Sequence, residues 1–454
     1  MSQFCIQDLN FEKDIGANSL YLTIGPFKIV VDAGMDPKNF GNKALPNFNH
    51  IQKDSIDFIL LSHCHLDHLG GLPVLLKAQN KAKVLVSYPT SLIAPLMLEN
   101  SYTVMLRQKA EQTIPEYPLY NKDDIEQTKK RFQIFQFAQS QYFQKDDKTL
   151  IVTFFQAGHV LGASSILLEY EGKRLFITGD ILFQNQKTLK GAHVPFVEDL
   201  DVLVLETTRG RTQRLADRVN EEQRLLNVIR NTLERQGVCL IPAFALGRIQ
   251  ELLSVLHHAY KQNLLPECPI YCSGLGMALI STFDELGKTC PSVIFDKKII
   301  KQLHIKSLRR RKIGPESKLQ GPAIYLLSSG MLVEHTPSYK VASCLLDDAK
   351  NTICFVGYCD PSTPGGQLLN TEADSIFNFK SLNFSTPVRA KIEHFDLSGH
   401  ADREDLYNFA IEQSPKKIVL THGDNEARQW FEKQFQQHPS LTILNPEVGK
   451  LYAL

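Results

Sequence analysis

The sequence predicts an α/β protein with more than one domain, and three observations lead to this fold class. Short β-branched runs separated by turns fill the first 200 residues, as strands do. After residue 206, long helical patterns alternate with brief apolar runs, which predicts a parallel sheet covered by helices. The last 65 residues return to strand-helix alternation. A length of 454 residues gives a prior of roughly three domains, and we expect two.

The strands expected in the first half share β-branched residues and often end in a turn containing glycine. They are residues 19–24, 27–32, 57–61, 83–87, 149–156, 164–170 and 173–178. One interruption, residues 121–137, has helical spacing. Its acids lie near the start and its bases near the end, which matches a helix dipole.

The second half shows apolar residues at three- and four-residue spacing, which predicts helices. These helices are expected at residues 221–235, 248–262 and 277–286, with strands at 202–206, 237–241, 269–272, 323–327 and 352–356. The C-terminal part begins with a strand near Ala390 and continues with a helix, a strand and a helix, at residues 402–412, 417–420 and 425–435.

Composition limits the functions that the chain can have. The chain has 50 Lys and Arg against 49 Asp and Glu, so it lacks the overall positive charge typical of proteins that bind nucleic acid non-specifically. Any site for a polyanion must therefore be a local basic patch. No apolar run approaches the roughly 18 residues that span a bilayer, and acids occupy the first 14 residues, where a signal peptide is basic. We therefore expect no membrane contact and a cytoplasmic location, with the nucleus left open. Nine scattered cysteines without a CxxC motif suggest free thiols.

The strongest chemical signal is a cluster of histidines and an aspartate directly after an apolar strand. The segment SHCHLDH places His63, His65, Asp67 and His68 within six residues. Imidazole and carboxylate together suit Zn²⁺ or a similar divalent ion. Structural histidines with hydrogen-bond partners are the alternative, but so many polar groups after a buried strand would be costly without partners. The cluster therefore predicts a metal site.

The ligand set of this cluster is incomplete, so further ligands are expected at later strand ends. His159, Asp180 and His422 each follow an apolar strand and lie beside glycine, which lets the backbone approach closely. A single His or Asp after a strand is more often a turn residue. In this order, however, the three positions form a specific pattern.

Two sets of motifs in this chain resemble a known family. Asp32 in VVDAG, followed by the residues above, resembles the ordered motifs of the metallo-β-lactamase fold. Glu206 in LETTRG, the segment PAFALGR at 242–248, the segment SGM at 329–331 and His400 in SGHAD resemble the β-CASP branch, whose members are nucleases. A histidine at 422, where DNA-repair members have valine, makes the chain similar to the RNA-cleaving members. Those are related to the mRNA 3′-end processing endonuclease and its bacterial counterparts.

This resemblance implies a fold and its domains. It implies an αββα metallo-β-lactamase sandwich formed by residues 1–205 and 386–454. An α/β β-CASP domain, residues 206–385, is inserted between these two parts. The substrate is then expected in the cleft between the domains.

The resemblance also implies a set of metal ligands. One zinc is assigned to His63, His65 and His159, the second to Asp67, His68 and His422, and Asp180 bridges both. Asp32 would orient a ligand or its loop, although a plain turn aspartate at a strand end remains the alternative. Strand-like alternation turns Cys64 toward the core, away from the metals.

The chemistry that fits this site is phosphodiester hydrolysis. Two ions about 3.5–4 Å apart can activate a hydroxide and neutralise charge on phosphate oxygens. The leaving ribose oxygen needs a proton, for which His400 is the expected general acid, with Glu206 fixing its tautomer. The alternative for His400 is a position in the N-cap region of the helix that follows.

We therefore expect a zinc-dependent ribonuclease with two Zn²⁺ per chain and RNA as its partner. Endonucleolytic cleavage is preferred, a 5′-exonuclease mode is also considered, and a homodimer is left open. A metallo-hydrolase of thioesters or lactones is the second enzyme hypothesis, because a zinc core alone supports that chemistry. A silent RNA-binding scaffold is the hypothesis from a different class.

Candidate RNA contacts lie on the inserted half. Residues 297–312 include no acidic residue and eight basic ones, among them Arg309, Arg310 and Arg311. If these side chains bind phosphates, the affinity for RNA should fall as the salt concentration rises. A solvated surface face is the alternative. Ser329 and Gly330 could offer backbone N–H groups to a phosphate. Arg209 replaces the usual tyrosine of the family, and the loop 363–367 lacks an arginine, so RNA register is expected to differ from that of relatives.

Overall fold

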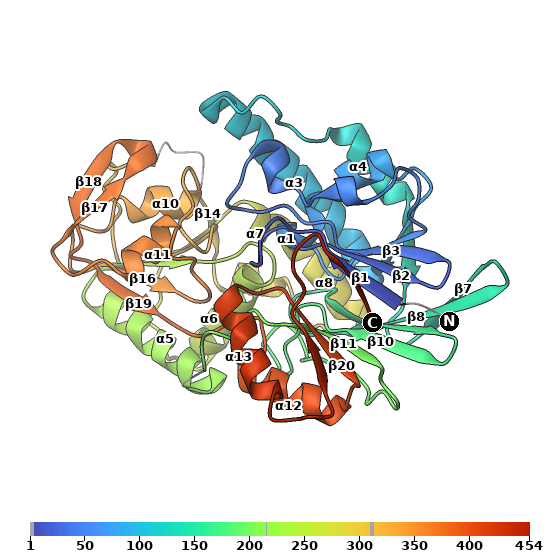
Figure 1. The fold of residues 1–454 in the computed structure, drawn as a ribbon. Helices are drawn as coiled ribbons and strands as arrows, with labels where there is room; N and C mark the ends of the chain where they lie inside the picture. The colour runs from blue at the N-terminus through green and yellow to red at the C-terminus, as the bar shows by residue number, and fades with distance from the viewer. Residues whose placement is uncertain (1–3, 215, 309–312) are drawn as a thin grey trace. The chain divides into compact units, whose positions relative to one another are not determined.

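The computed structural model describes residues 4–214, 216–308 and 313–454, which form two compact units (Figure 1). The first unit consists of Met1–Asn185, Gly191–Gln213 and His400–Leu454, and the second of Gln186–Lys190 and Arg214–Gly399. Both contain helices and sheets, which confirms the α/β prediction. Among the described residues, no helix has the length and apolar character that crossing a membrane requires.

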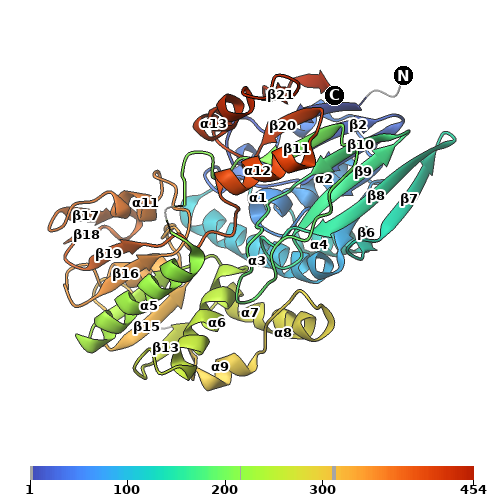
Figure 2. The same ribbon diagram turned by 90° about the horizontal axis from the view of Figure 1, so that it is seen from below.

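Two seven-stranded sheets make up the centre of the first unit (Figure 2). The first sheet runs in the order β22 (Leu451–Ala453), β1 (Phe4–Asp8), β2 (Leu20–Ile24), β3 (Phe27–Val31), β4 (Phe58–Leu60), β5 (Lys83–Ser87) and β6 (Phe132–Phe135). The second runs β21 (Thr442–Leu444), β20 (Lys417–Thr421), β11 (Val202–Glu206), β10 (Lys173–Ile177), β9 (Ser164–Tyr170), β8 (Lys148–Gln156) and β7 (Ser140–Lys145).

The core of this unit lies between the two sheets. Alternate residues of a strand point to the same face, so Leu20, Leu22 and Ile24 of β2 join Val152 and Phe154 of β8 in one buried cluster. Helices cover the outer faces: α3 (Tyr88–Gln112) contacts β5 and β6, α12 (Arg403–Gln413) contacts β11, and α13 (Asn425–Phe435) contacts β20. The layers are therefore αββα, as the resemblance implied. The remaining helices of the unit are α1 (Leu66–Leu69), α2 (Leu72–Ala78), α4 (Lys122–Lys130), η1 (Gly41–Ala44) and η2 (Phe48–His50).

The strand directions bring distant loops to one edge of each sheet. Strands β3, β4 and β5 are parallel, and so are β10, β11 and β20. The carboxyl ends of parallel neighbours meet at the same edge, so the segments after β3 and β4 are neighbours, as are those after β10, β11 and β20. These segments carry Asp32, the cluster from His63 to His68, Asp180 and His422. His159 instead follows β8, which is antiparallel to β9.

The second unit contains a six-stranded sheet whose neighbouring strands are all parallel. Its order is β14 (Lys306–Ser307), β13 (Ile270–Cys272), β15 (Ala323–Leu327), β12 (Val238–Pro242), β16 (Thr352–Phe355) and β19 (Lys391–His394). A separate hairpin joins β17 (Ile376–Phe379) to β18 (Phe384–Pro387). The helices are α5 (Arg218–Glu234), α6 (Arg248–Lys261), α7 (Leu275–Ala278), α8 (Ile280–Thr289), α9 (Lys298–Gln302), α10 (Pro337–Ala342), α11 (Pro364–Leu369) and η3 (Lys380–Leu382).

Apart from the short segment Gln186–Lys190, the chain passes from the first unit to the second at residues 213/214 and returns at 399/400. The second change follows from strand pairing, because β19 pairs with β16 and stays with the sheet of the second unit. The domain limits that the sequence predicts, 1–205, 206–385 and 386–454, remain a proposal about the family domains.

Several elements of the first unit were not expected, among them β1, α2, β7 and α3. The helix expected at 121–137 ends at Lys130, and residues 132–135 form β6, because their backbone pairs with β5. The sequence interpretation made no prediction for the 25-residue helix α3, which contains Pro95, a residue that disfavours a helix interior. Its N-terminus is capped by Ser87, whose side chain accepts from the Thr90 backbone N–H, and burial of residues such as Met97 offsets the proline.

Candidate metal centre

The structure brings together all seven side chains that the sequence assigned to metals. His63 lies between β4 and α1, and His65 directly precedes α1, which contains Asp67 and His68. The others come from loops: His159 between β8 and β9, Asp180 after β10, and His422 after β20. Five of these side chains are buried, and His65 and Asp67 are partly exposed. The segments that supply them all belong to the first unit.

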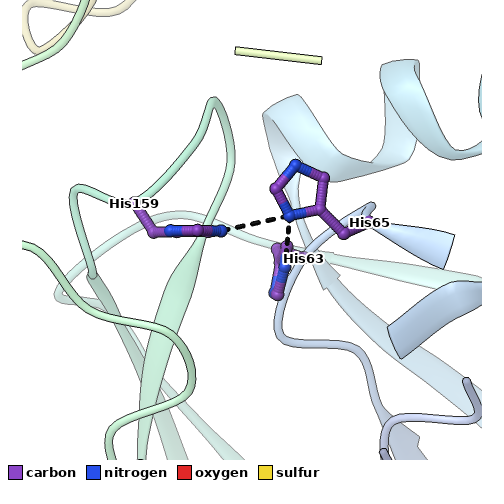
Figure 3. A group of neighbouring side chains, drawn as sticks. All are labelled: His63, His65 and His159. Atoms are coloured by element: carbon purple, nitrogen blue, oxygen red, sulfur yellow. Dashed lines mark hydrogen bonds between the residues drawn. The ribbon is translucent and has the colours of Figure 1, made fainter. Parts of the chain in front are cut away.

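Three histidines form the first group of potential ligands (Figure 3). The Nδ1 atom of His65 lies 3.2 Å from Nε2 of His63 and 3.1 Å from Nε2 of His159. Three imidazole nitrogens that converge in this way have too few protons to hydrogen-bond to one another. One cation, however, would bind the lone pairs of all three. A tetrahedral zinc with Zn–N bonds of about 2.0–2.1 Å separates its nitrogen ligands by roughly 3.3 Å, which is close to these distances.

A second group consists of Asp67, His68 and His422. The Nε2 atoms of His68 and His422 are 3.1 Å apart. Oδ2 of Asp67 lies 3.7 Å from the first of these nitrogens and 3.6 Å from the second. The group therefore offers two nitrogens and one carboxylate oxygen to the same point.

Asp180 faces both groups. Its Oδ2 atom lies 3.5 Å from Nε2 of His63, 3.7 Å from Nε2 of His159 and 3.4 Å from Nε2 of His68. Its other oxygen is 3.3 Å from Nδ1 of His422. One carboxylate is thus in contact with nitrogens of both groups, which is the place that the resemblance gives to a bridging ligand.

The electrostatics of the cluster fit a divalent cation. Burial lowers the pKa of His63 and His65, which favours the neutral imidazole that binds metals. Burial opposes the charge of Asp180, but His422, His68 and His63 hold the pKa of this carboxyl well below its usual range. Neutral imidazoles combined with ionised carboxylates form the donor set of zinc and similar ions. These residues could therefore hold a metal ion.

Asp32 lies behind His68, not at an open turn. It follows β3 with a positive φ of 61°, and its carboxylate accepts hydrogen bonds at 2.7 Å from both the backbone N–H and the hydroxyl of Ser62. Nδ1 of His68 is also 2.7 Å from Asp32 Oδ2, so Nε2 of this ring is directed to the ligand cluster. Burial alone would lower the pKa of His68, but Asp180, Asp32 and Asp67 together hold it well above the ordinary value.

The sequence interpretation missed two polar neighbours of Asp32. Ser62 is the buried residue directly before the histidine cluster, and Nδ2 of Asn18 lies 3.3 Å from Nδ1 of His68. The position of Ser62, between an apolar strand and the histidine cluster, could have indicated its role from the sequence. Asn18 is 50 residues from His68 in the chain, so no local spacing indicates it.

His400 and Glu206 form a contact of their own at this site. Glu206 is the last residue of β11, and its Oε2 lies 2.9 Å from Nδ1 of His400. Burial would lower the pKa of His400, but Glu206 and Asp180 raise it above its ordinary value. The N-cap of α12 is Asp402, so His400 is not the cap of this helix. Its ring centroid is 4.4 Å from that of His159, which places it beside the first group of ligands.

The other predicted residues lie elsewhere. Cys64 is buried with its Sγ atom 3.6 Å from the Thr90 carbonyl, which confirms that it turns into the core. In the second unit, Ser329 Oγ accepts from the backbone N–H of Val333 at 2.9 Å. Gly330 follows Ser329, and its role toward RNA stays a prediction. Arg309, Arg310 and Arg311 lie outside the described residues.

Arg209 and two lysines of the basic run have acidic partners. Nε of Arg209 lies 3.5 Å from Oδ1 of Asp402, in the first unit. Lys297 and Lys298, at the start of the run, lie 3.5 Å from Asp284 and Asp296. Part of the charge of the run is therefore balanced within the protein.

Gly34 sets the position of α1 and its two ligands. A Cβ atom at Gly34 would lie 1.8 Å from the carbonyl oxygen of Asp67 and 2.7 Å from the backbone nitrogen of Asn18. Gly34→Ala is therefore expected to lower the free energy of unfolding by about 1–3 kcal/mol and to weaken metal binding, because α1 must move. Urea unfolding and metal titration measure the two effects. Gly357→Ala, where a Cβ meets nothing within 4 Å, is the matched control, and equal losses in both variants would contradict this account.

Three family models match consecutive parts of the chain. Residues 21–202 match a metallo-beta-lactamase superfamily domain. Residues 249–368 match a Beta-Casp domain. Residues 385–444 match a Zn-dependent metallo-hydrolase RNA specificity domain. These matches follow the order of the motifs along the chain.

Several curated proteins are similar over most of this chain. Cleavage and polyadenylation specificity factor subunit 3 of Dictyostelium discoideum is 29% identical, covering 97% of this chain and 56% of that protein. Endoribonuclease YSH1 of Yarrowia lipolytica is 28% identical, covering 91% of this chain and 49% of that protein. Transcription termination factor FttA of Methanocaldococcus jannaschii is 28% identical, covering 93% and 68%. The chain thus spans about half the length of the first two relatives.

One solved structure shares the fold at low sequence identity. It is a protein of unknown function from Enterococcus faecalis V583, with a TM-score of 0.55 and 12% identity. The match covers 100% of both chains. It supports the architecture alone.

Proposed function

Because this chain belongs to the β-CASP branch of the metallo-β-lactamase superfamily, we propose that it is a metal-dependent ribonuclease. The observation that carries the proposal is the convergence of seven ligand-type side chains beside the Glu206–His400 pair. The match of residues 385–444 to an RNA specificity domain and the name endoribonuclease of a relative support RNA as the substrate.

The ligands of the proposed site follow from the two groups. His63, His65 and His159 would hold one Zn²⁺, Asp67, His68 and His422 the second, and Asp180 would contact both. When bound, such ions neutralise charge on phosphate oxygens and lower the pKa of water. Asp32 keeps the His68 ring oriented through its contact with Nδ1.

His400 is the proposed general acid. Its Nδ1 atom faces the carboxylate of Glu206, so Nε2 is the nitrogen that can hand a proton to the leaving ribose oxygen. The carboxylate also favours the charged imidazolium, which is the form that carries this proton. Glu206 itself is fixed on its other side, because Oε1 accepts the backbone N–H of Ile181 at 2.7 Å.

We propose endonucleolytic cleavage as the main mode. A 5′-exonuclease mode would use the same metal site together with a pocket for the 5′ phosphate. Ser329, Gly330 and the arginines 309–311 remain the proposed RNA contacts, and the homodimer stays a prediction. The thioester or lactone hydrolase and the silent RNA-binding scaffold are weaker candidates, because neither makes use of the Glu206–His400 pair.

RNA cleavage by the 454-residue chain tests the proposal. Internally labelled RNA carrying a 5′ monophosphate or a 5′ triphosphate is incubated with the zinc-loaded protein, and the products are resolved by mass. We expect internal fragments from both substrates, whereas an exonuclease releases mononucleotides and distinguishes the two 5′ ends. Hydrolysis assays with a thioester and a lactone test the small-molecule hydrolase. A binding assay that measures RNA retention tests the silent RNA-binding scaffold. Retention of RNA without cleavage across a panel of divalent ions would overturn the proposal.

A further inference from the structure

A chain of hydrogen bonds runs from the ligand cluster to His400 through Thr208, a residue with no role in the site described above. The hydroxyl of Thr208 lies 2.8 Å from Nδ1 of His422 and 2.5 Å from Oε2 of Glu206. The same carboxylate oxygen is 2.9 Å from Nδ1 of His400. Thr208 is thus the one side chain in direct contact with both Glu206 and His422 among the hydrogen bonds of the described residues.

The two nitrogens of His422 face different partners. Nε2 lies 3.1 Å from Nε2 of His68 and 3.6 Å from Oδ2 of Asp67, on the side of the ligand cluster. Nδ1 lies nearest to Thr208 at 2.8 Å, while the Asp180 carboxylate is farther at 3.3 Å. A metal-binding nitrogen carries no proton, so the proton of a neutral His422 belongs on Nδ1. Thr208 is the best placed acceptor for it.

Proton counting gives the direction of the chain. A carboxylate can only accept, so the single hydroxyl proton of Thr208 is donated to Glu206 Oε2. The lone pairs of that hydroxyl are then free to accept Nδ1–H of His422. The contact from the hydroxyl to the His422 carbonyl, at 3.2 Å, is longer and competes for the same proton. Glu206 Oε2 therefore receives two donors, Thr208 and His400.

We propose that Thr208 is a positioning residue that fixes the tautomer of His422 and, through Glu206, the orientation of His400. The inference rests on the function proposed above and extends it. Loss of the hydroxyl leaves Nδ1–H of His422 without its nearest acceptor and leaves Glu206 with one donor fewer. A metal ligand and the general acid then lose a shared support, although neither is itself changed.

Thr208→Val tests this role, because valine keeps the shape of threonine and removes the hydroxyl. We expect zinc affinity, measured by competition with a chromogenic chelator, to fall about 10–100-fold, as for loss of the outer partner of a ligand. The kcat for RNA cleavage should fall while KM stays unchanged. Thr208→Ser retains the hydroxyl and should restore both values to within about threefold of the wild type.

The neighbouring threonine supplies a matched control. Thr207 is buried, and its hydroxyl donates to the Thr421 carbonyl at 2.9 Å. Among the described residues this hydroxyl has no hydrogen bond to a side chain of the ligand cluster, so Thr207→Val should leave zinc affinity unchanged. Thermal denaturation of the metal-free proteins checks that each variant is folded. If the Thr208→Val protein does not fold, Thr208→Ala is used in its place. The proposal is overturned if Thr208→Val keeps zinc affinity, if serine fails to rescue, or if Thr207→Val is equally impaired.

A double-mutant cycle separates this role from simple packing. In a Glu206→Gln background, Thr208→Val should reduce kcat by a smaller factor than in the wild type, because part of its effect passes through Glu206. Equal factors in both backgrounds would contradict the shared support. Zinc affinity can be measured without RNA cleavage. If the chain binds zinc but does not cleave RNA, the ribonuclease proposal is contradicted, while the zinc affinity of Thr208→Val still tests the proposed contact with His422.

Discussion

Asp180→Asn is expected to remove most of the bound metal and, with it, RNA cleavage. The amide keeps the shape of the side chain but loses the charge that faces nitrogens of His63, His68 and His159 at 3.4–3.7 Å. The loss of metal affinity should exceed the roughly 10–100-fold that follows when only the outer partner of a ligand is removed. Elemental analysis after gel filtration measures the metal, and labelled RNA measures cleavage.

A second aspartate on the same unit serves as the control for this substitution. Asp201 lies outside the ligand cluster, where it accepts the backbone N–H of Arg174 at 2.9 Å and pairs with Lys416 at 2.8 Å. Asp201→Asn should keep its full metal content. If Asp180→Asn retained two equivalents of metal and its cleavage rate, the bridging role would have to be abandoned.

His400→Ala is expected to lower RNA cleavage by about 10²–10⁴-fold, the usual contribution of a general acid, with metal content unchanged. The side chain is 17% exposed and contacts Glu206, so its loss removes a proton donor and no assigned ligand. A phosphodiester with a p-nitrophenolate leaving group needs no proton, and its hydrolysis should be reduced far less than that of RNA. Steady-state rates with the two substrates measure the difference.

A histidine elsewhere on the same unit provides the comparison. Nε2 of His438 accepts or donates a hydrogen bond at 2.8 Å with the Tyr407 hydroxyl, and His438→Ala should leave both rates unchanged. An equal loss on RNA and on the p-nitrophenyl ester would show that His400 acts by some route other than protonation of the leaving group. Loss of metal from His400→Ala would instead favour a ligand role.

Much of the site was predictable because ligands collect at strand ends. The HxHxDH cluster is local, and His159, Asp180 and His422 each follow a strand that the sequence reveals by its apolar residues. Parallel pairing of β10, β11 and β20 then brings the last residues of these strands together. The role of each residue, however, came from the resemblance and remains a proposal.

The local patterns failed where packing outweighed propensity. No helix was predicted for α3, which contains Pro95, yet the helix forms with apolar residues buried and with contacts to β5 and β6. Residues 132–135 continued a helical pattern, but backbone pairing with β5 makes them a strand. Both outcomes depend on partners that lie far away in the sequence.

The sequence by itself determined which donor side chains the chain carries and which strands they follow, because apolar periodicity and residue chemistry are local properties. The resemblance already paired Glu206 with His400, but only the tertiary structure decided that Asp32 lies behind His68 and that Thr208 lies behind His422. These pairs are 194, 36 and 214 residues apart, so sheet pairing and not spacing brings them within hydrogen-bond distance. Hydrogen bonds act over about 3 Å, and contacts of that range form only once the strands are in place.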